Sequence, residues 1–313
     1  MWQDFLICVN AVIPSAIYLI IGIVLRLAGI VTEEEVRKFT KVTFIALYPF
    51  LMFDNLYGKH IEDHISAKLI IFVVLLFLFQ LITSIVYVKR FERIEGNRAT
   101  MVQSLFRSNI VIMGLPIAVN LFGKANIVSV AVVLMVIVPL YNITAVVLFE
   151  KDRPEKTGSW QIALDVLKNP LIVGGLVALI VMALEIRVPK TLHLTIVTLS
   201  DTASPIAMIL LGASLNLQGM KSDIKRIITC VFGKLVIFPA IGIISAVLIG
   251  LRGVDLIAVV LMVATPVALA SYAMASSMGG NGRLAAETVV VSTIAACFTI
   301  PIWLFILKTN GLF

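Results

Sequence analysis

The sequence predicts an all-α membrane protein in which ten transmembrane helices form a five-plus-five inverted repeat. Three observations support this fold class. Of the 313 residues, 60% are hydrophobic and 14% are charged, which is too little polar surface to cover a soluble protein of this length. Ten apolar runs follow one another, each close to the about 20 residues that a helix needs to cross a bilayer. Prolines also recur at matching positions in the two halves.

Breaks in hydropathy locate the ten expected spans. They lie at residues 8–30, 40–58, 66–88, 99–122, 126–149, 164–185, 192–217, 226–250, 254–278 and 284–307. These runs are continuous rather than alternating, and lipid offers backbone polar groups no partners, so each should be a helix. We expect a first five-helix repeat at 1–150, a short connection at 151–163 and a second repeat at 164–313.

The basic residues predict the orientation. Of the 25 Lys and Arg residues, sixteen lie in one set of alternate loops, seven lie in the other set, and Arg107 and Lys234 lie within spans. Cytoplasmic loops carry the excess of positive charge in membrane proteins. We therefore expect a multi-pass protein of the plasma or inner membrane with both termini extracytoplasmic and 151–163 cytoplasmic. This bias also explains most of the net charge of +7, so no nucleic-acid partner is expected.

Four proline pairs indicate the repeat. The pairs, first half before second, are Pro14 and Pro170, Pro49 and Pro205, Pro116 and Pro266, and Pro139 and Pro301. Because five spans are an odd number, the second half would enter the membrane upside down relative to the first. Inverted repeats are typical of secondary transporters, whose binding site lies near the bilayer midplane where matching helices are interrupted.

The fourth and ninth expected spans carry these interruptions. Gly114 and Pro116 lie about halfway through the fourth span, and Thr265 and Pro266 lie near the middle of the ninth. Proline removes a backbone donor and clashes with the preceding turn, so each helix should break or kink there. Thr265 before Pro266 also fits an N-cap followed by proline at the first helical position. Two half-helix N-termini at the midplane would stabilise a carboxylate.

Polar side chains inside spans are costly and are therefore functional candidates. Besides the four residues just named, we expect substrate contacts from Asn109, Asn120, Asn142, Lys234, Ser271 and Tyr272. Candidates for charge compensation or coupling are Arg107, Asp201 and Glu287. Alternatives remain: Arg107 can extend to the membrane interface, Glu287 can neutralise Arg283, and Asp201 can form a structural hydrogen bond. Lys234 reaches an interface less easily, so we favour Lys234 over Arg107 as the functional cation.

No motif indicates an enzyme, a cofactor or a metal. His60 and His64 are spaced as in some zinc proteases, but the acidic residues between them are misplaced for zinc chemistry. The sequence contains no P-loop, no nucleophile elbow and no dinucleotide fingerprint. Transport driven by nucleotide hydrolysis within this chain is therefore not expected.

Several motifs resemble the auxin efflux carrier family, which includes plant PIN-type carriers and bacterial malate or malonate permease-like proteins. They are NIVIMGLP at 109–116, the glycine at 123, ATP at 264–266 and TIP at 299–301. Asn109, seven residues before Pro116, is the most specific mark. The order of the motifs and the ten-span pattern cover nearly the whole chain.

The resemblance implies a fold like that of sodium/proton antiporters and bile-acid symporters. Spans 1, 2, 6 and 7 would form a scaffold that dimerises, and spans 3–5 and 8–10 would form a moving transport domain. The broken fourth and ninth helices would cross at Pro116 and Pro266, with Asn109 near a bound organic anion. The chain departs from the long plant members because it lacks their large central loop and the second proline after the ninth-span crossing, where it has Ala-Ser-Tyr at 270–272.

We therefore expect a secondary transporter that moves small organic carboxylates, malate-like, malonate-like or auxin-like, by an elevator-type alternating-access mechanism. One alternative is a sodium- or proton-coupled antiporter or symporter of the same fold, which ranks lower because neither Asn109 nor Thr265 has an acidic neighbour. Another alternative is an intramembrane enzyme, or a sensor that transports no substrate. An enzyme would need a catalytic pair inside the spans, and a sensor would need a soluble output domain; the sequence offers neither.

Overall fold

The computed structural model describes residues 17–57, 66–123, 128–152, 164, 167–214 and 220–313. Residues 8–16 of the first expected span, both histidines near residue 60 and the 151–163 connection beyond Asp152 lie outside this part.

Five described helices are long and apolar enough to cross a membrane: α4 (Ala67–Phe91), α7 (Val128–Lys151), α10 (Lys190–Ser214), the continuous run Asp223–Leu248, and α15 (Gly282–Thr309). Shorter apolar helices include Ile17–Leu27, α9 (Pro170–Ala183) and α13 (Gly253–Ala264). The all-α membrane class is confirmed.

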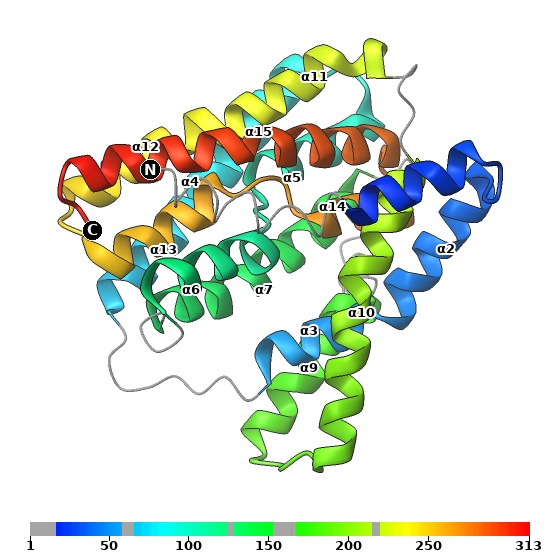
Figure 1. The fold of residues 1–313 in the computed structure, drawn as a ribbon, viewed down its shortest axis with the longest axis horizontal. Coiled ribbons are helices and arrows are strands. Elements are labelled where there is room, and N and C mark those ends of the chain that lie inside the picture. Colours follow the sequence, from blue (N-terminus) through cyan, green and yellow to red (C-terminus); the bar gives the residue numbers. More distant parts are fainter. Residues whose placement is uncertain (1–16, 58–65, 124–127, 153–163, 165–166, 215–219) are drawn as a thin grey trace.

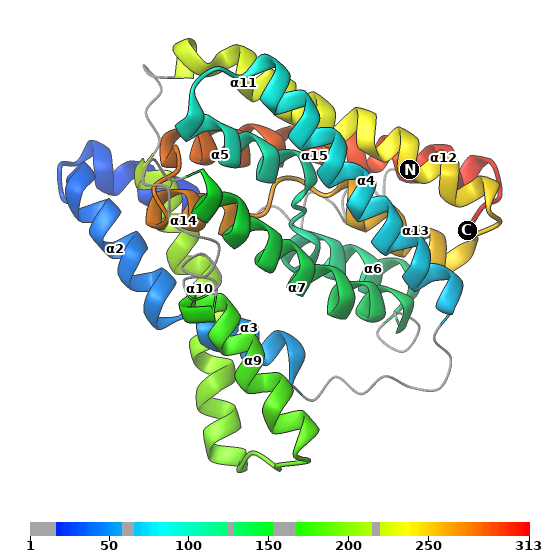
Figure 2. The same ribbon diagram turned by 180° about the vertical axis from the view of Figure 1, so that it is seen from behind.

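One set of helices, which we call the first group, contains Ile17–Leu27, α2 (Glu33–Ala46), α3 (Tyr48–Leu56), α9 and α10. Helix α3 packs against both α9 and α10, and α2 packs against α10. Glycines allow these close contacts, because a Cβ atom at Gly174 would collide with the carbonyl oxygen of Pro49. Figures 1 and 2 show α3, α9 and α10 projecting together from one end of the molecule.

Helix α2 begins earlier than the expected second span. The Thr32 hydroxyl accepts a hydrogen bond from the Glu35 amide at 3.3 Å, and the Glu35 carboxylate accepts one from the Thr32 amide at 2.7 Å. This reciprocal capping box satisfies two amides that the first helical turn leaves without partners. The chain then passes into α3 at Leu47, just before Pro49, so two helices cover the expected span.

The remaining described helices form the second group. It contains α4, α5 (Glu95–Phe106), the π-helix η1 (Ile110–Gly114), α6 (Leu115–Phe122), α7, α11 (Met220–Phe232), the π-helix η3 (Gly233–Ile237), α12 (Phe238–Leu248), α13, α14 (Leu269–Ser277) and α15. One apolar core, including Phe77, Phe106, Ile137 and Val260, lies within this group. A second core joins the two groups, with Tyr48 and Met52 of α3 among its members.

Two helical spans of the second group are interrupted, as the sequence predicts, but not at every predicted residue. Between α5 and η1, residues 107–109 leave the helical conformation, and residues 265–268 do so between α13 and α14. The prediction of a break at Pro116 is wrong, because Pro116 lies in the first turn of α6. Proline fits that position, where its missing N–H has no helical partner to lose.

The predicted N-cap role of Thr265 is also wrong. Thr265 follows the last residue of α13, and its hydroxyl donates to the Leu261 carbonyl at 2.8 Å. The next half-helix begins at Leu269, three residues after Pro266. The proline therefore lies in the extended segment between the two halves.

Candidate functional site

The two interrupted segments, 107–109 and 265–268, lie against each other, and we call this arrangement the crossing. Ser108 and Val267 form an antiparallel β-bridge. The Asn109 amide donates to the Pro266 carbonyl at 2.8 Å, and the Ala268 amide donates to the Arg107 carbonyl at 3.3 Å. Each segment thus supplies backbone partners that the other lost when its helix ended.

Two helix N-termini begin at the crossing. η1 starts at Ile110 and α14 starts at Leu269, and neither has a side-chain cap. The first amides of a helix have no intrahelical acceptors and carry the positive end of the helix dipole. The crossing is therefore a place where an anion can be bound by backbone groups.

A cavity of about 80 Å³ lies beside the crossing. The second group lines it with residues of both interrupted segments and with Val138, Tyr141 and Asn142 of α7. The first group lines it with Tyr48, Leu51 and Met52 of α3, Leu171 of α9 and Ser204 of α10. The cavity thus lies between the two groups and contacts both.

Arg107 is the cation of this cavity. Its side chain is buried, with the residue 4% exposed, and one guanidinium nitrogen donates to the Asn142 side-chain oxygen. Another donates to the Met274 sulfur. Among the residues that the structure describes, no Asp or Glu pairs with Arg107, and none lines the cavity. A buried guanidinium with only neutral partners favours the arrival of an anion.

Asn109 adds a free donor. The residue is 4% exposed and lines the same cavity, and its side-chain nitrogen has no hydrogen-bond partner within the described part of the chain. A buried donor without an acceptor costs about 1–3 kcal/mol. A ligand oxygen in the cavity would remove that cost.

Lys234 lies next to the crossing but does not line the cavity. It is 0% exposed, and its ammonium group donates to the Ser108 hydroxyl and, at 3.1 Å, to the Val263 carbonyl. The Ser108 hydroxyl in turn donates to the Met262 carbonyl. These carbonyls belong to the last turn of α13, where the helix dipole is negative. The geometry favours Arg107 over Lys234 for ligand contact, the reverse of the expectation from sequence.

The other predicted residues lie at varying distances from the cavity. Asn142 lines it, whereas Gly114 packs against Leu261 of α13 and Asn120 is exposed on α6. Ser271 is buried on α14, and its backbone carbonyl accepts a hydrogen bond from the Gln103 side chain of α5 at 2.8 Å. No side-chain position is described for Pro116.

Tyr272 and Asp201 have other surroundings. The Tyr272 hydroxyl lies 3.2 Å from the Thr40 hydroxyl of α2, so this hydrogen bond connects the two groups. Tyr272 lines a separate groove of about 1040 Å³ between α2 and the region around α14 and α15. Asp201 is exposed on α10. A partly buried acid nearby is Asp54, which accepts a hydrogen bond from Ser200 at 3.0 Å.

Several residues of the site could not be identified from the sequence. Ser108 holds the crossing together, and its position next to Asn109 was the only available signal. Tyr48, Tyr141 and Ser204 reach the cavity from apolar runs in which nothing marks them as special. Their role depends on contacts between distant helices.

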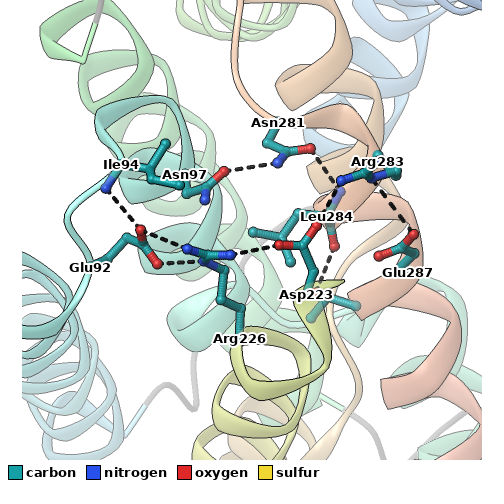
Figure 3. Close-up of polar contacts among 10 residues, drawn as sticks. Glu92, Ile94, Asn97, Asp223, Arg226, Asn281, Arg283, Leu284 and Glu287 are labelled. Carbon is teal, nitrogen blue, oxygen red and sulfur yellow. Dashed lines mark hydrogen bonds and ion pairs between the residues drawn. The ribbon is translucent and has the colours of Figure 1, made fainter. Parts of the chain in front are cut away.

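Glu287 lies in a charge network away from the cavity (Figure 3). The network consists of Glu92, Asp223, Arg226, Arg283 and Glu287. Burial alone would raise the pKa of Glu92, but hydrogen bonds from Arg226 and the Ile94 amide outweigh burial and lower it. Within the described part of the chain, no cluster of three His, Cys, Asp or Glu residues is arranged to hold a metal ion.

Comparison with known proteins identifies the family. No curated protein matches the chain significantly. Residues 7–304 match the family model described as membrane transport protein, which covers nearly the whole chain. The resemblance to auxin efflux carriers rests on the same family and is confirmed. The chain therefore belongs to the membrane transport protein family of the auxin efflux carriers and is a membrane transporter.

Proposed function

We propose that this transporter moves small organic carboxylate anions and binds them in the cavity at the crossing. The observation that carries the proposal is the buried Arg107 guanidinium, which lines the cavity without an acidic partner among the described residues. The free Asn109 amide and the N-termini of η1 and α14 add donors that suit carboxylate oxygens.

The cavity volume favours small substrates. The cavity of about 80 Å³ is smaller than the roughly 150 Å³ of an engineered apolar cavity that holds one benzene molecule. Malate-like or malonate-like anions suit this space better than an aromatic, auxin-like anion, which would require the two groups to separate further. The alternative of sodium/proton antiport at the crossing is less well supported, since the described cavity lining contains no carboxylate.

We infer an elevator mechanism from the way the two groups share the site. The first group corresponds to spans 1, 2, 6 and 7, and we assign it as the scaffold domain. The second corresponds to spans 3–5 and 8–10, and we assign it as the transport domain of a ten-span inverted repeat. Movement of the transport domain past α3 would expose the cavity to opposite sides of the membrane in turn. The family resemblance further suggests a homodimer formed through the scaffold.

The test starts with purified protein in lipid nanodiscs. A thermal-shift screen against mono- and dicarboxylates, with and without sodium, identifies anions that raise the Tm by binding the folded state. Radiolabelled uptake of each stabilising anion into proteoliposomes then tests transport. Arg107→Gln removes the charge of the cavity. Arg252→Gln is the matched control, because Arg252 is exposed and, within the described part of the chain, donates only to the backbone carbonyls of Val247 and Leu251.

We expect Arg107→Gln to weaken anion binding by about 10- to 150-fold, the effect of losing a hydrogen bond to a charged group. Arg252→Gln should bind like the wild type. Unchanged affinity in folded Arg107→Gln, or stabilisation only by cationic or neutral ligands, would contradict the proposed site and substrate class.

A further inference from the structure

The charge network contains an unequal number of acids and bases. Arg226 contacts Glu92 at 2.6 Å and Asp223 at 2.8 Å, and Arg283 contacts Asp223 at 3.0 Å. Figure 3 shows these side chains arranged in a row that ends at Glu287. Three carboxyl groups thus share two guanidinium groups, and the carboxyl at the end of the row is the one left over.

Glu287 is that surplus group, and it is deeply buried. The residue is 0% exposed, and neither carboxyl oxygen has a hydrogen-bond partner within the described part of the chain. Its nearest cation is Arg283, whose Nε lies 3.9 Å away, beyond hydrogen-bonding distance, and which is already engaged by Asp223. A buried carboxylate without donors is costly, whereas the protonated carboxyl is neutral.

Among the described residues, no cation other than Arg283 lies within ion-pairing distance of Glu287. From its own helix Glu287 faces Arg283, and from α11 it faces Asp223, which contacts both Arg226 and Arg283. Helix α5 contributes Asn97 to this region, while its Glu95 and Arg98 pair with each other at 3.3 Å. Helix α14 contains no charged residue. Lys234 of η3, which also packs on α15, is directed to Ser108 and Val263.

Glu287 lies on α15 between a solvent-exposed arginine and a serine that contacts the crossing. Arg283, with its side chain 44% exposed, lines the groove of about 1040 Å³ on the side predicted to be cytoplasmic. Further along the same helix, the Ser292 hydroxyl accepts a hydrogen bond from the Val267 amide of the crossing at 3.1 Å. A change of charge at Glu287 therefore acts on the helix that supports the binding site.

We propose that Glu287 is a proton-binding site that couples anion transport to proton movement in the same direction. The inference rests on the proposed function, since it adds a coupling ion to that transport. Glu287 accepts one proton from the groove side, and the anion and the proton then cross together. The proton is released on the other side, so each transported anion carries one fewer net negative charge across the membrane.

The first experiment needs no substrate. Infrared spectroscopy of the protein in lipid, titrated over pH, detects the carbonyl stretch of protonated carboxyl groups. We expect a band at neutral pH that titrates in the wild type and is missing in Glu287→Gln. It should persist in Glu95→Gln, which changes an exposed acid near the same network. Because glutamine resembles the protonated carboxyl, the Tm of Glu287→Gln should stay close to that of the wild type.

The second experiment measures uptake of radiolabelled malonate by proteoliposomes with an imposed proton gradient. For one coupled proton, each pH unit shifts the accumulation ratio by up to about tenfold. Wild type and Glu95→Gln should show this response. Glu287→Gln should bind malonate in the thermal-shift assay yet accumulate it independently of the gradient.

Several outcomes would overturn the proton site. These are a spectrum without a Glu287 band, a large loss of Tm in Glu287→Gln, or a wild-type response to sodium instead of protons. A titrating band together with gradient-independent wild-type uptake would make Glu287 a structural group only. Failure of the wild type to bind or take up any carboxylate would instead refute the proposed function, and the infrared titration separates the two cases.

Discussion

Arg107 and Asn109 are two residues apart and would contribute different groups to the proposed anion site. Arg107 supplies a full charge that is held in place by Asn142 and Met274. Asn109 supplies a neutral donor that has no acceptor among the residues described in the structure. A single full charge with additional neutral donors is well suited to a transporter, because the substrate must also leave.

The first prediction concerns Asn109. Asn109→Ala should weaken binding of the stabilising anion by about 10- to 150-fold, since a hydrogen bond to a charged group contributes about 1.5–3 kcal/mol. Asn109→Asp should bind still more weakly, because it places a negative charge beside the anion. Isothermal titration calorimetry on folded protein measures both, with Asn120→Ala on the exposed face of α6 as control. Wild-type affinity in both Asn109 variants would make Asn109 a packing residue.

The second prediction separates the two buried cations. Lys234→Met removes the donor to Ser108 and to the Val263 carbonyl, so the free energy of unfolding should fall by about 2–4 kcal/mol. Arg107→Gln should instead lower affinity with little change in Tm. Thermal unfolding and anion binding, measured on both variants, give the comparison. Loss of affinity in Lys234→Met without loss of Tm would place Lys234 in the site, as the sequence alone suggests.

At the scale of elements, hydropathy predicts the helices well and their interruptions less well. The apolar runs match α4, α7, α10 and α15 closely because their length is set by the bilayer. The fourth-span break was expected at Pro116, but proline is tolerated in a first helical turn. The helix ends earlier, at residues 107–109, where the partners come from the other segment of the crossing. Such long-range partners leave no local sequence signal.

The candidate site was predictable to a similar extent. Arg107, Asn109 and Asn142 stand out as polar residues within apolar runs, and all three line the cavity. The opposite wall, including Tyr48 and Leu171, depends on how α3 and α9 pack against the crossing, which hydropathy does not encode.

The third prediction tests the packing of α3 on α9. Gly174→Ala places a Cβ against the Pro49 backbone, so the helices must move apart, and the free energy of unfolding should fall by about 1–3 kcal/mol. Gly96→Ala is the matched control, because a Cβ there meets no atom within 4 Å and alanine favours the helix. Thermal unfolding in lipid compares the two. Equal Tm values would show that the α3–α9 contact is looser than the structure indicates.

At the scale of the whole molecule, the distribution of basic residues predicts the orientation in the membrane. We predict that a cysteine replacing Glu33, at the exposed start of α2, reacts with an impermeant thiol reagent only after the cells are permeabilised. A cysteine replacing the exposed Thr191 at the start of α10 should react in intact cells. Both measurements use a background without the three native cysteines. The opposite labelling pattern would invert the topology derived from the sixteen-to-seven charge bias.

The proposed elevator mechanism requires the two groups to move past each other, so a tether between them should stop transport but not binding. Thr40 of α2 and Tyr272 of α14 meet through their hydroxyls at 3.2 Å, and Tyr272 borders the groove through which a reagent can enter. In the double variant Thr40→Cys and Tyr272→Cys, a short bifunctional thiol reagent should abolish uptake while the anion still raises the Tm.

Asn97→Cys with Asn281→Cys is the matched control for this tether. These side chains contact each other at 2.8 Å, but both belong to the second group, so linking them leaves the two groups free to move. Uptake by the control should survive cross-linking, and a reagent with a reducible linker should let the reductant restore uptake to the Thr40–Tyr272 pair. Full transport by the tethered Thr40–Tyr272 protein would rule out sliding at this interface, because a covalent link there is incompatible with displacement of α14 along α2.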